Sequence, residues 1–268
     1  MTDAGRLDGH CLLAVVAHPD DESLACGGVL ALCAQRGVRA AVLCLTRGEH
    51  RGDADPGAAD AQAQVRTAEL RSAAAALGVT DLVVLDYADG LLPWADASAI
   101  ERDIRQAIDR LVPDVVVTFD EDGLYWHPDH VAVHERTTAA VSTLVGRTPA
   151  LYYVTMPQGR MRALVDGVAG RADSQGTGAH VLGIEDPDAF GAAAPPPTHV
   201  VDVRAFARHK LEALRCHATQ IHDGAVARVT LDEAPLWLGL EQYRRAAVGS
   251  SDPSFLDRLP ETTIAGGT

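Results

Sequence analysis

Residues 12–35 read LLAVVAHPDDESLACGGVLALCAQ, and this stretch decides the fold. Leu12–Ala17 is a short apolar run, typical of a strand buried on both faces. A polar turn, His18–Glu22, separates it from a helix-patterned segment at Leu24–Gln35. Gly37 then fits a helix C-terminus. A strand that leads through a tight turn into a helix is the repeating unit of a parallel α/β fold.

The same alternation continues to about residue 155. Apolar runs predict four more strands, at Ala40–Leu45, Leu82–Leu85, Val115–Phe119 and Ala150–Val154. Periodic segments predict three more helices, at Ala61–Leu77, Ala97–Leu111 and Val131–Leu144. Asp96 or Ser98 can cap the second of these, and Gly78 fits the end of the first. We therefore predict right-handed βαβ units in a Rossmann-like, three-layer α/β/α fold with a mostly parallel sheet.

Beyond Gly159 the pattern weakens. We expect surface excursions at Gly167–His180 and Gly191–Thr198, a strand at Val200–Val203, a helix from Arg204 to about Thr219 and a last helix at Pro235–Ala247. No linker divides the chain, so we predict a single domain over residues 1–268. Its core is expected at 10–155, a variable part that completes the site at 156–258, and a disordered tail at 259–268.

Composition excludes several classes of partner. The chain has 268 residues with 23 Lys+Arg and 37 Asp+Glu, a net charge of −14, which argues against general binding to nucleic acid or to anionic membranes. The five cysteines are scattered and form no CxxC pair, as expected for buried, reduced thiols in a cytoplasmic protein. Met1–His10 lacks a signal-peptide core, and no apolar run reaches 18 residues. We therefore expect a small-molecule partner. The composition does not decide whether the chain forms a homo-oligomer.

Histidines and carboxylates follow two of the predicted strands. His18–Glu22 comes after the first strand, and Asp120–His130 comes after the strand at Val115–Phe119. Ligands of open parallel sheets bind at the carboxyl ends of the strands. Acids in a first helical turn also complement the helix dipole, but two such segments at one edge favour a shared site. His18, Asp21 and one histidine of the second segment would make a two-His, one-carboxylate set with an open position, the pattern of catalytic zinc.

The motifs Ala17–Glu22, Gly27-Gly28 and His127–His130 resemble those of the PIG-L/LmbE-like deacetylases. These are zinc-dependent enzymes that remove N-acetyl groups from glucosaminyl compounds or cleave related amides of mycothiol conjugates. The resemblance is close over residues 10–150 and loose beyond. It implies a ligand set for one Zn²⁺ per chain, with Fe²⁺ also compatible, made of His18, Asp21 and His130.

The resemblance also implies the catalytic groups. Asp20 matches the general base that takes a proton from the attacking water. His127 matches the residue that stabilises the oxyanion and protonates the leaving amine, with Asp129 beside it to keep the imidazole protonated. Tyr125 stands where relatives carry a Tyr that can swing towards the oxyanion.

Further residues are candidates for binding substrate. The resemblance implies that Arg66 and Asp89 contact the sugar, and that Glu49 lies in a loop over the site, in Thr46–Asp53. Trp126 replaces a Gly that is frequent in relatives, so it either narrows the site or stacks on a sugar. Two other residues are expected to be structural, namely Glu22 in its turn and His134 one helical turn beyond His130.

The sequence thus predicts a metal-dependent hydrolase that removes an N-acyl group, N-acetyl first, from a glucosaminyl-type small molecule. Two alternatives keep this chemistry, a mycothiol S-conjugate amidase and a deacetylase that tailors antibiotic intermediates. A catalytically silent sugar-binding module would lack the chemistry. The last alternative is a Rossmann-like nucleotide-binding protein that uses Gly27-Gly28, although the G-x-G-x-x-G fingerprint is missing at the first turn.

Overall fold

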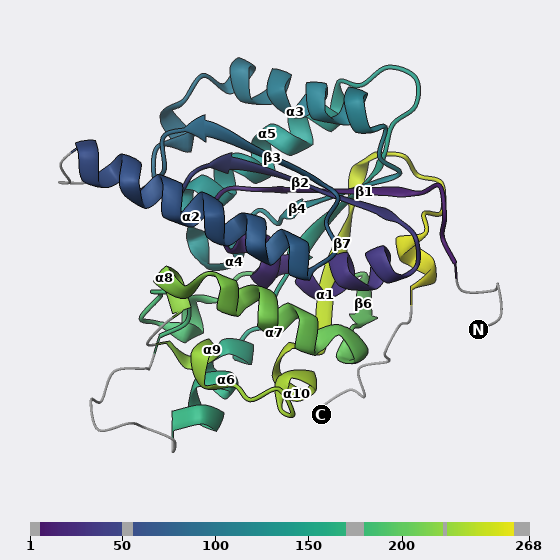
Figure 1. Cartoon of the computed structure of the whole chain (residues 1–268). Coiled ribbons are helices and arrows are strands. Elements are labelled where there is room, and N and C mark those ends of the chain that lie inside the picture. The colour runs from purple at the N-terminus through teal and green to yellow at the C-terminus, as the bar shows by residue number, and fades with distance from the viewer. Residues whose placement is uncertain (1–5, 50–55, 170–179, 222–223, 260–268) are drawn as a thin grey trace.

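The computed structural model describes residues 6–49, 56–169, 180–221 and 224–259. Within these ranges seven strands form one sheet in the order β3-β2-β1-β4-β5-β7-β6 (Figure 1). The strands are β1 (Cys11–Val16), β2 (Arg39–Thr46), β3 (Asp81–Tyr87), β4 (Val115–Phe119), β5 (Ala150–Thr155), β6 (His199–Asp202) and β7 (Leu240–Gly249). The first five strands pair in parallel, and β7 pairs antiparallel with both β5 and β6.

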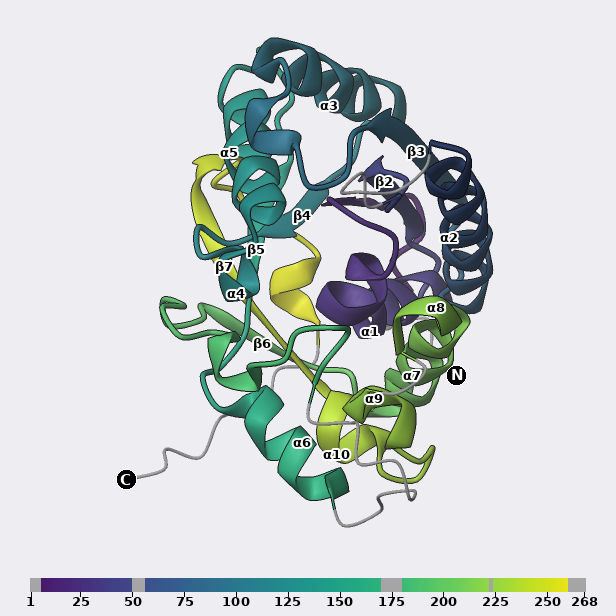
Figure 2. The ribbon, with the colours of Figure 1, turned by 90° about the vertical axis from the view of Figure 1, so that its left-hand side faces the viewer.

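Helices cover both faces of this sheet, which gives the predicted three layers (Figure 2). One face carries α3 (Ala97–Leu111) and α5 (Pro128–Ser142), and the other carries α1 (Asp21–Gln35) and α2 (Pro56–Ala76). Helix α7 (Ala207–Cys216) packs outside α1 and α2. The shorter helices are α4 (Gly123–Trp126), α6 (Arg160–Ala169), α8 (Ala218–Ile221), α9 (Ala225–Arg228) and α10 (Ala234–Leu238).

The buried centre of the sheet follows from its apolar runs. Every residue of β1, β4 and β5 is buried, because helices lie on both faces of these strands. The five strands predicted up to residue 155 are confirmed, and so are the four helices, although α1, α2 and α5 begin three to five residues earlier than predicted. Asp96 caps α3 by accepting a hydrogen bond from Ser98 N at 2.9 Å. Gly37 and Gly78 have φ of 87° and 74°, as helix C-termini require.

The prediction of a last helix at Pro235–Ala247 is wrong. Helix α10 ends at Leu238, and the residues that follow form β7. Leu, Glu, Gln, Arg and Ala are good helix formers, which is why the segment resembled a helix. Pairing with two strands overrides that preference, and the side chains of Arg244 and Arg245 bind Asp120 and Asp257.

The rest of the C-terminal part was predicted in outline only. The strand at β6 is confirmed, and the helix predicted from Arg204 is α7 with α8, interrupted at His217. Helix α6 was missed. Gly167 lies inside α6 rather than in a surface excursion, and a Cβ there would come within 2.3 Å of the Trp237 ring. Residues 170–179 and 260–268, which make up most of the excursion predicted at Gly167–His180 and of the predicted tail, lie outside the described ranges. The excursion predicted at Gly191–Thr198 is described and contains neither helix nor strand.

The glycine pair of α1 serves packing inside the protein. A Cβ on Gly28 would lie 2.5 Å from Val203 Cγ2. Helix α1 is kinked at Cys26, where φ is −143°. The amides of Gly28 and Val29 beyond the kink donate to the Glu241 carboxylate at 2.7 and 2.9 Å. Because the amide of Gly28 is used by a buried carboxylate, the geometry does not support a phosphate site at this pair.

All five cysteines are free thiols, four of them buried and Cys216 partly buried. Among the described residues, no helix combines the length and apolar character needed to cross a bilayer.

Candidate metal centre

The site lies at the carboxyl edge of two neighbouring parallel strands. His18 and Asp20 occupy the turn between β1 and α1, and Asp21 begins α1. His127 caps the N-terminus of α5, and His130 lies in the first turn of that helix. Because β1 pairs with β4, the two loops meet at one edge of the sheet.

Three side chains expected as metal ligands converge there. His130 Nε2 lies 3.1 Å from Asp21 Oδ1 and 3.3 Å from His18 Nδ1, and His18 Nδ1 lies 3.5 Å from Asp21 Oδ2. Donors around a tetrahedral zinc with bonds of about 2.0–2.1 Å would be roughly 3.3 Å apart. The two imidazole nitrogens and the oxygens of the Asp21 carboxylate therefore have distances close to those of a metal-ligand set.

Outer contacts fix which nitrogen of each imidazole faces the cluster. His18 Nε2 lies 3.0 Å from Asp129 Oδ2 and 3.0 Å from Asp89 Oδ1, so this nitrogen donates and leaves Nδ1 for the centre. His130 Nδ1 donates to the Gly123 carbonyl at 3.1 Å and leaves Nε2 for it. Such carboxylate or carbonyl partners are what metal-binding histidines commonly have.

The electrostatics of the cluster also suit a cation. Burial acts to lower the pKa of His18, but hydrogen bonds with Asp129, Asp21 and Asp89 outweigh it and raise that pKa well above its usual value. Burial acts to raise the pKa of Asp21, but His130 and His18 hold it well below its usual value. Negative charge therefore dominates around the imidazoles, which favours a bound divalent ion.

Among the described residues, two overlapping groups of three have donor atoms within 4.8 Å of one another. One is His18, His127 and His130, and the other is His18, Asp89 and Asp129. His18 is common to both. The residues at this edge thus fit a metal, and His18 Nδ1, His130 Nε2 and the Asp21 carboxylate lie 3.1–3.5 Å from one another.

Asp20 lies beside this cluster in a strained backbone conformation. Its φ of 119° is in the left-handed region, and its N–H donates to Glu22 Oε2 at 3.1 Å. Its carboxylate receives a hydrogen bond from Arg66 Nη2 at 3.2 Å. Burial raises the pKa of Asp20 to about 6, although Arg66 acts to lower it. A carboxylate with a pKa near neutrality suits a general base.

His127 is presented to the same centre by its capping contact. Its ring centre lies 4.8 Å from that of His18 and 4.7 Å from that of His130. Its Nδ1 accepts the N–H of Asp129 at 3.2 Å, so a neutral ring carries its proton on Nε2. Burial, followed by the nearby His130 and His18, lowers the pKa of His127 to about 4.

The expected pairing of the Asp129 carboxylate with His127 is wrong. That carboxylate accepts hydrogen bonds from His18 Nε2, from Gly90 N at 2.8 Å and from Leu92 N at 3.1 Å. These three donors surround a fully buried group, so Asp129 orients His18 and the loop after β3.

The neighbouring aromatic residues differ in exposure. The Tyr125 ring packs edge-on to His130 at 5.2 Å and against Phe190 at 4.7 Å. Burial raises the pKa of Tyr125 well above its usual value, so its hydroxyl stays protonated. Trp126 is 58% exposed with φ of 64°, one residue before His127.

The other candidates for substrate binding are buried. Arg66 is 3% exposed, and it donates to the carbonyls of Gly48 and Pro19 besides Asp20. Asp89 contacts His18, and its N–H donates weakly to Glu49 Oε1 at 3.4 Å. These three side chains therefore lie against the loops that follow β1, β2 and β3. The remainder of the loop expected over the site, residues 50–53, lies outside the described ranges.

His134, expected to be structural, makes its contacts outside the group formed by His18, Asp21 and His130. Its Nδ1 donates to the Phe119 carbonyl at 3.0 Å, and its ring packs 4.6 Å from that of Tyr153.

Sequence reasoning missed one residue and understated another. His217 is fully buried, and its Nε2 lies 2.9 Å from Glu22 Oε1. Glu22 does support its turn as expected, through the amide of Asp20. Nothing in the local sequence around His217 points to a partner 195 residues away, because the contact depends on how α7 packs on α1.

Comparisons with known proteins agree with this geometry. The family model described as PIG-L, GlcNAc-PI de-N-acetylase, matches residues 13–141. The chain is 34% identical over 258 residues to a 1D-myo-inositol 2-acetamido-2-deoxy-alpha-D-glucopyranoside deacetylase of Acidothermus cellulolyticus, with 87% of each chain covered. It is 37% identical over 243 residues to a protein of the same description from Actinosynnema mirum, covering 80% of this chain and 83% of that one. The fold is similar to that of N,N'-diacetylchitobiose deacetylase from Pyrococcus horikoshii, with a TM-score of 0.62, 20% identity, and 88% of this chain and 83% of that one covered.

Proposed function

Because the chain belongs to the PIG-L family of deacetylases, we propose that it is a metal-dependent hydrolase that removes the N-acetyl group of a glucosaminyl-type small molecule. The observation that carries the proposal is the convergence of His18 Nδ1, His130 Nε2 and Asp21 within 3.5 Å of one another, beside Asp20. The curated relatives are described as acting on an inositol-linked 2-acetamido-2-deoxyglucoside, so this conjugate is the first substrate to test.

His18, Asp21 and His130 would hold the metal, which we propose to be zinc, with Fe²⁺ compatible with the same donors. When bound, the ion would supply a Lewis acid that polarises an amide carbonyl and lowers the pKa of water. Asp129 and Gly123 keep the two imidazoles in the tautomers that bind a metal.

Two further side chains would move or hold protons during the reaction. Asp20 accepts the proton of the attacking water, since its carboxylate lies at the cluster with a raised pKa, and returns it to the amine nitrogen as the C–N bond breaks. His127 donates a hydrogen bond from Nε2–H to the oxyanion that forms as the amide carbonyl is attacked. We assign Tyr125 to the same wall of the site, as a donor that stays protonated.

Substrate binding is proposed for the exposed Trp126, whose ring can stack on a sugar face beside His127. Arg66, Asp89 and Glu49 would contribute indirectly, because their side chains hold the neighbouring loops in place. We also propose that residues 156–258 complete the site of a single domain, because Glu22 is bound by His217 from that part of the chain.

Acetate release tests the proposal. Metal-loaded protein is incubated with the inositol-linked N-acetylglucosaminide, with other N-acetylglucosaminides and with mycothiol S-conjugates, and free acetate and amine are measured. We expect acetate from the first conjugate with the highest kcat/KM. Cleavage of the mycothiol conjugates alone would favour the amidase, and no cleavage of any of them by metal-loaded protein would reject the hydrolase.

Replacing His127 should slow the reaction without removing the metal. Asn is a good helix cap, so His127→Asn keeps the contact with the Asp129 amide while it removes the Nε2–H donor. We expect kcat to fall by about 10²–10³-fold, the usual effect of losing one oxyanion donor. Metal analysis and steady-state kinetics check this, and loss of the metal together with activity would show that His127 is a ligand instead.

A further inference from the structure

A buried chain of polar contacts joins the C-terminal part of the protein to the backbone of Asp20. His217 Nε2 lies 2.9 Å from Glu22 Oε1, and Glu22 Oε2 accepts the N–H of Asp20 at 3.1 Å. The side chains of His217 and Glu22 are both 0% exposed. Ser23 Oγ donates to the same Oε1 at 2.5 Å, so the Glu22 carboxylate is held on three sides.

His217 has a fixed position at the end of α7. Its N–H donates to the Leu214 carbonyl at 3.1 Å, and α7 packs against α1. Among the described residues, its Nδ1 has no hydrogen-bond partner. The hydrogen bond between Nε2 and Glu22 is therefore the polar contact that holds this buried ring. Burial acts to lower the pKa of His217, but the Glu22 carboxylate outweighs it and raises that pKa. The contact is therefore charge-assisted, and such hydrogen bonds are the stronger ones.

Asp20 needs support of this kind because of its backbone. A residue with a side chain at φ of 119° and ψ of −27° is strained, typically by about 1–3 kcal/mol, and persists only where its surroundings hold it. Glu22 holds the amide of Asp20, and Arg66 holds its carboxylate. We propose that His217 is a positioning residue that fixes Glu22, and through it the backbone of Asp20, in the orientation that the general base requires. The proposal rests on the function proposed above for Asp20.

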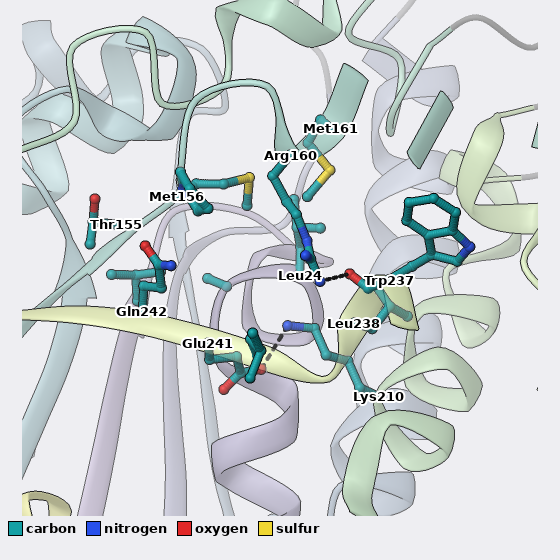
Figure 3. Close-up of a pocket in the computed structure, with 14 residues that line it drawn as sticks. Leu24, Thr155, Met156, Arg160, Met161, Lys210, Trp237, Leu238, Glu241 and Gln242 are labelled. Atoms are coloured by element: carbon teal, nitrogen blue, oxygen red, sulfur yellow. Dashed lines mark hydrogen bonds and ion pairs between the residues drawn. The ribbon is translucent and has the colours of Figure 1, made fainter. Parts of the chain in front are cut away.

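A second buried ion pair, between α7 and β7, offers a matched control. Lys210 of α7 donates to Glu241 Oε1 at 2.6 Å (Figure 3). Glu241 also accepts from the amides of Gly28 and Val29 in α1, beyond its kink. This pair lines a cavity with an empty volume of ≈ 520 Å³, open mouth included. The lining contains none of the residues of the metal centre. The Lys210 pair therefore shares helix α7 and the burial of the His217 pair but not its link to Asp20.

Three variants separate positioning from general stability. His217→Ala removes the donor, His217→Gln keeps an amide nitrogen near the position of Nε2, and Lys210→Met removes the control pair. Each is measured for thermal unfolding, metal content, kcat and KM, on the amide that the wild type cleaves. Crystal structures of the wild type and the two His217 variants report the backbone angles of Asp20.

We expect His217→Ala to lower kcat about 10- to 100-fold, the scale seen when residues that orient active-site groups are lost, with KM within about threefold and the metal retained. His217→Gln should recover most of kcat, and Lys210→Met should lower the unfolding temperature while kcat stays within about threefold, since it acts on stability alone. The inference is overturned if His217→Ala keeps the wild-type kcat, or if Lys210→Met lowers kcat as much as His217→Ala does.

The structural readout keeps the inference separate from the proposed function. If the metal-loaded wild type cleaves no amide, the proposed function fails, and the positioning role is decided by the angles of Asp20. We expect φ near 119° in the wild type and His217→Gln but not in His217→Ala. An unchanged backbone in His217→Ala would reject the positioning role.

Discussion

Asp20→Asn should lower kcat by about 10²–10⁴-fold while the protein keeps its metal, because a general base contributes on that scale. The amide has the shape of the carboxylate and can still accept the hydrogen bond from Arg66, but it cannot take a proton from water. Steady-state kinetics with metal analysis of the same preparation measure both quantities.

The matched control is Asp86→Asn on β3, whose side chain is 68% exposed and pairs with Arg47. This change should leave both kcat and metal content as in the wild type, since exposed pairs contribute little. If Asp20→Asn hydrolysed the amide within tenfold of the wild-type rate, Asp20 would not be the base.

Asp21→Asn should deplete the metal itself. The amide can still accept the hydrogen bond from His18 N that the carboxylate accepts at 2.7 Å, so the turn should survive. It loses the negative charge of the ligand, and we expect an affinity loss of more than about 100-fold, beyond the scale seen for outer partners. After dialysis, metal per chain should fall from about one, as a single three-ligand site requires, to a small fraction.

His134→Gln is the control for the metal analysis of Asp21→Asn. His134 lies one helical turn beyond His130, yet its nitrogen bonds to the Phe119 carbonyl. The variant should retain about one ion per chain, because the residue is outside the ligand set. Full metal content in Asp21→Asn, or its loss in His134→Gln, would contradict the assigned ligands.

Local pattern was enough to predict the first five strands, the helices between them and a site made of His18, Asp21 and one histidine of the second segment. Each depends on residues close in sequence and on the rule that parallel strands end at one edge. The family resemblance then selected His130. The antiparallel β7 could not be predicted in this way, because its residues favour a helix and only two distant strands decide otherwise.

The same limit applies to the site. That His127 lies next to His18 and His130 follows from its motif, but the direction of the Asp129 carboxylate does not. The amides of Gly90 and Leu92, from another loop, turn that carboxylate towards His18. His217 was missed for a similar reason, since its role depends on a contact between α7 and α1. Sequence pattern identified groups within one loop, and tertiary packing determined which of them interact.

The strained backbone of Asp20 lowers the stability of the protein, so selection for stability alone would favour its replacement. Gly adopts a φ of 119° without strain, so Asp20→Gly would relieve the strain while it removes the proposed general base. Directed evolution of this chain for heat resistance, without an activity screen, would therefore tend to discard the carboxylate that makes it useful. Screening for turnover at every round would be needed to keep a thermostable variant active.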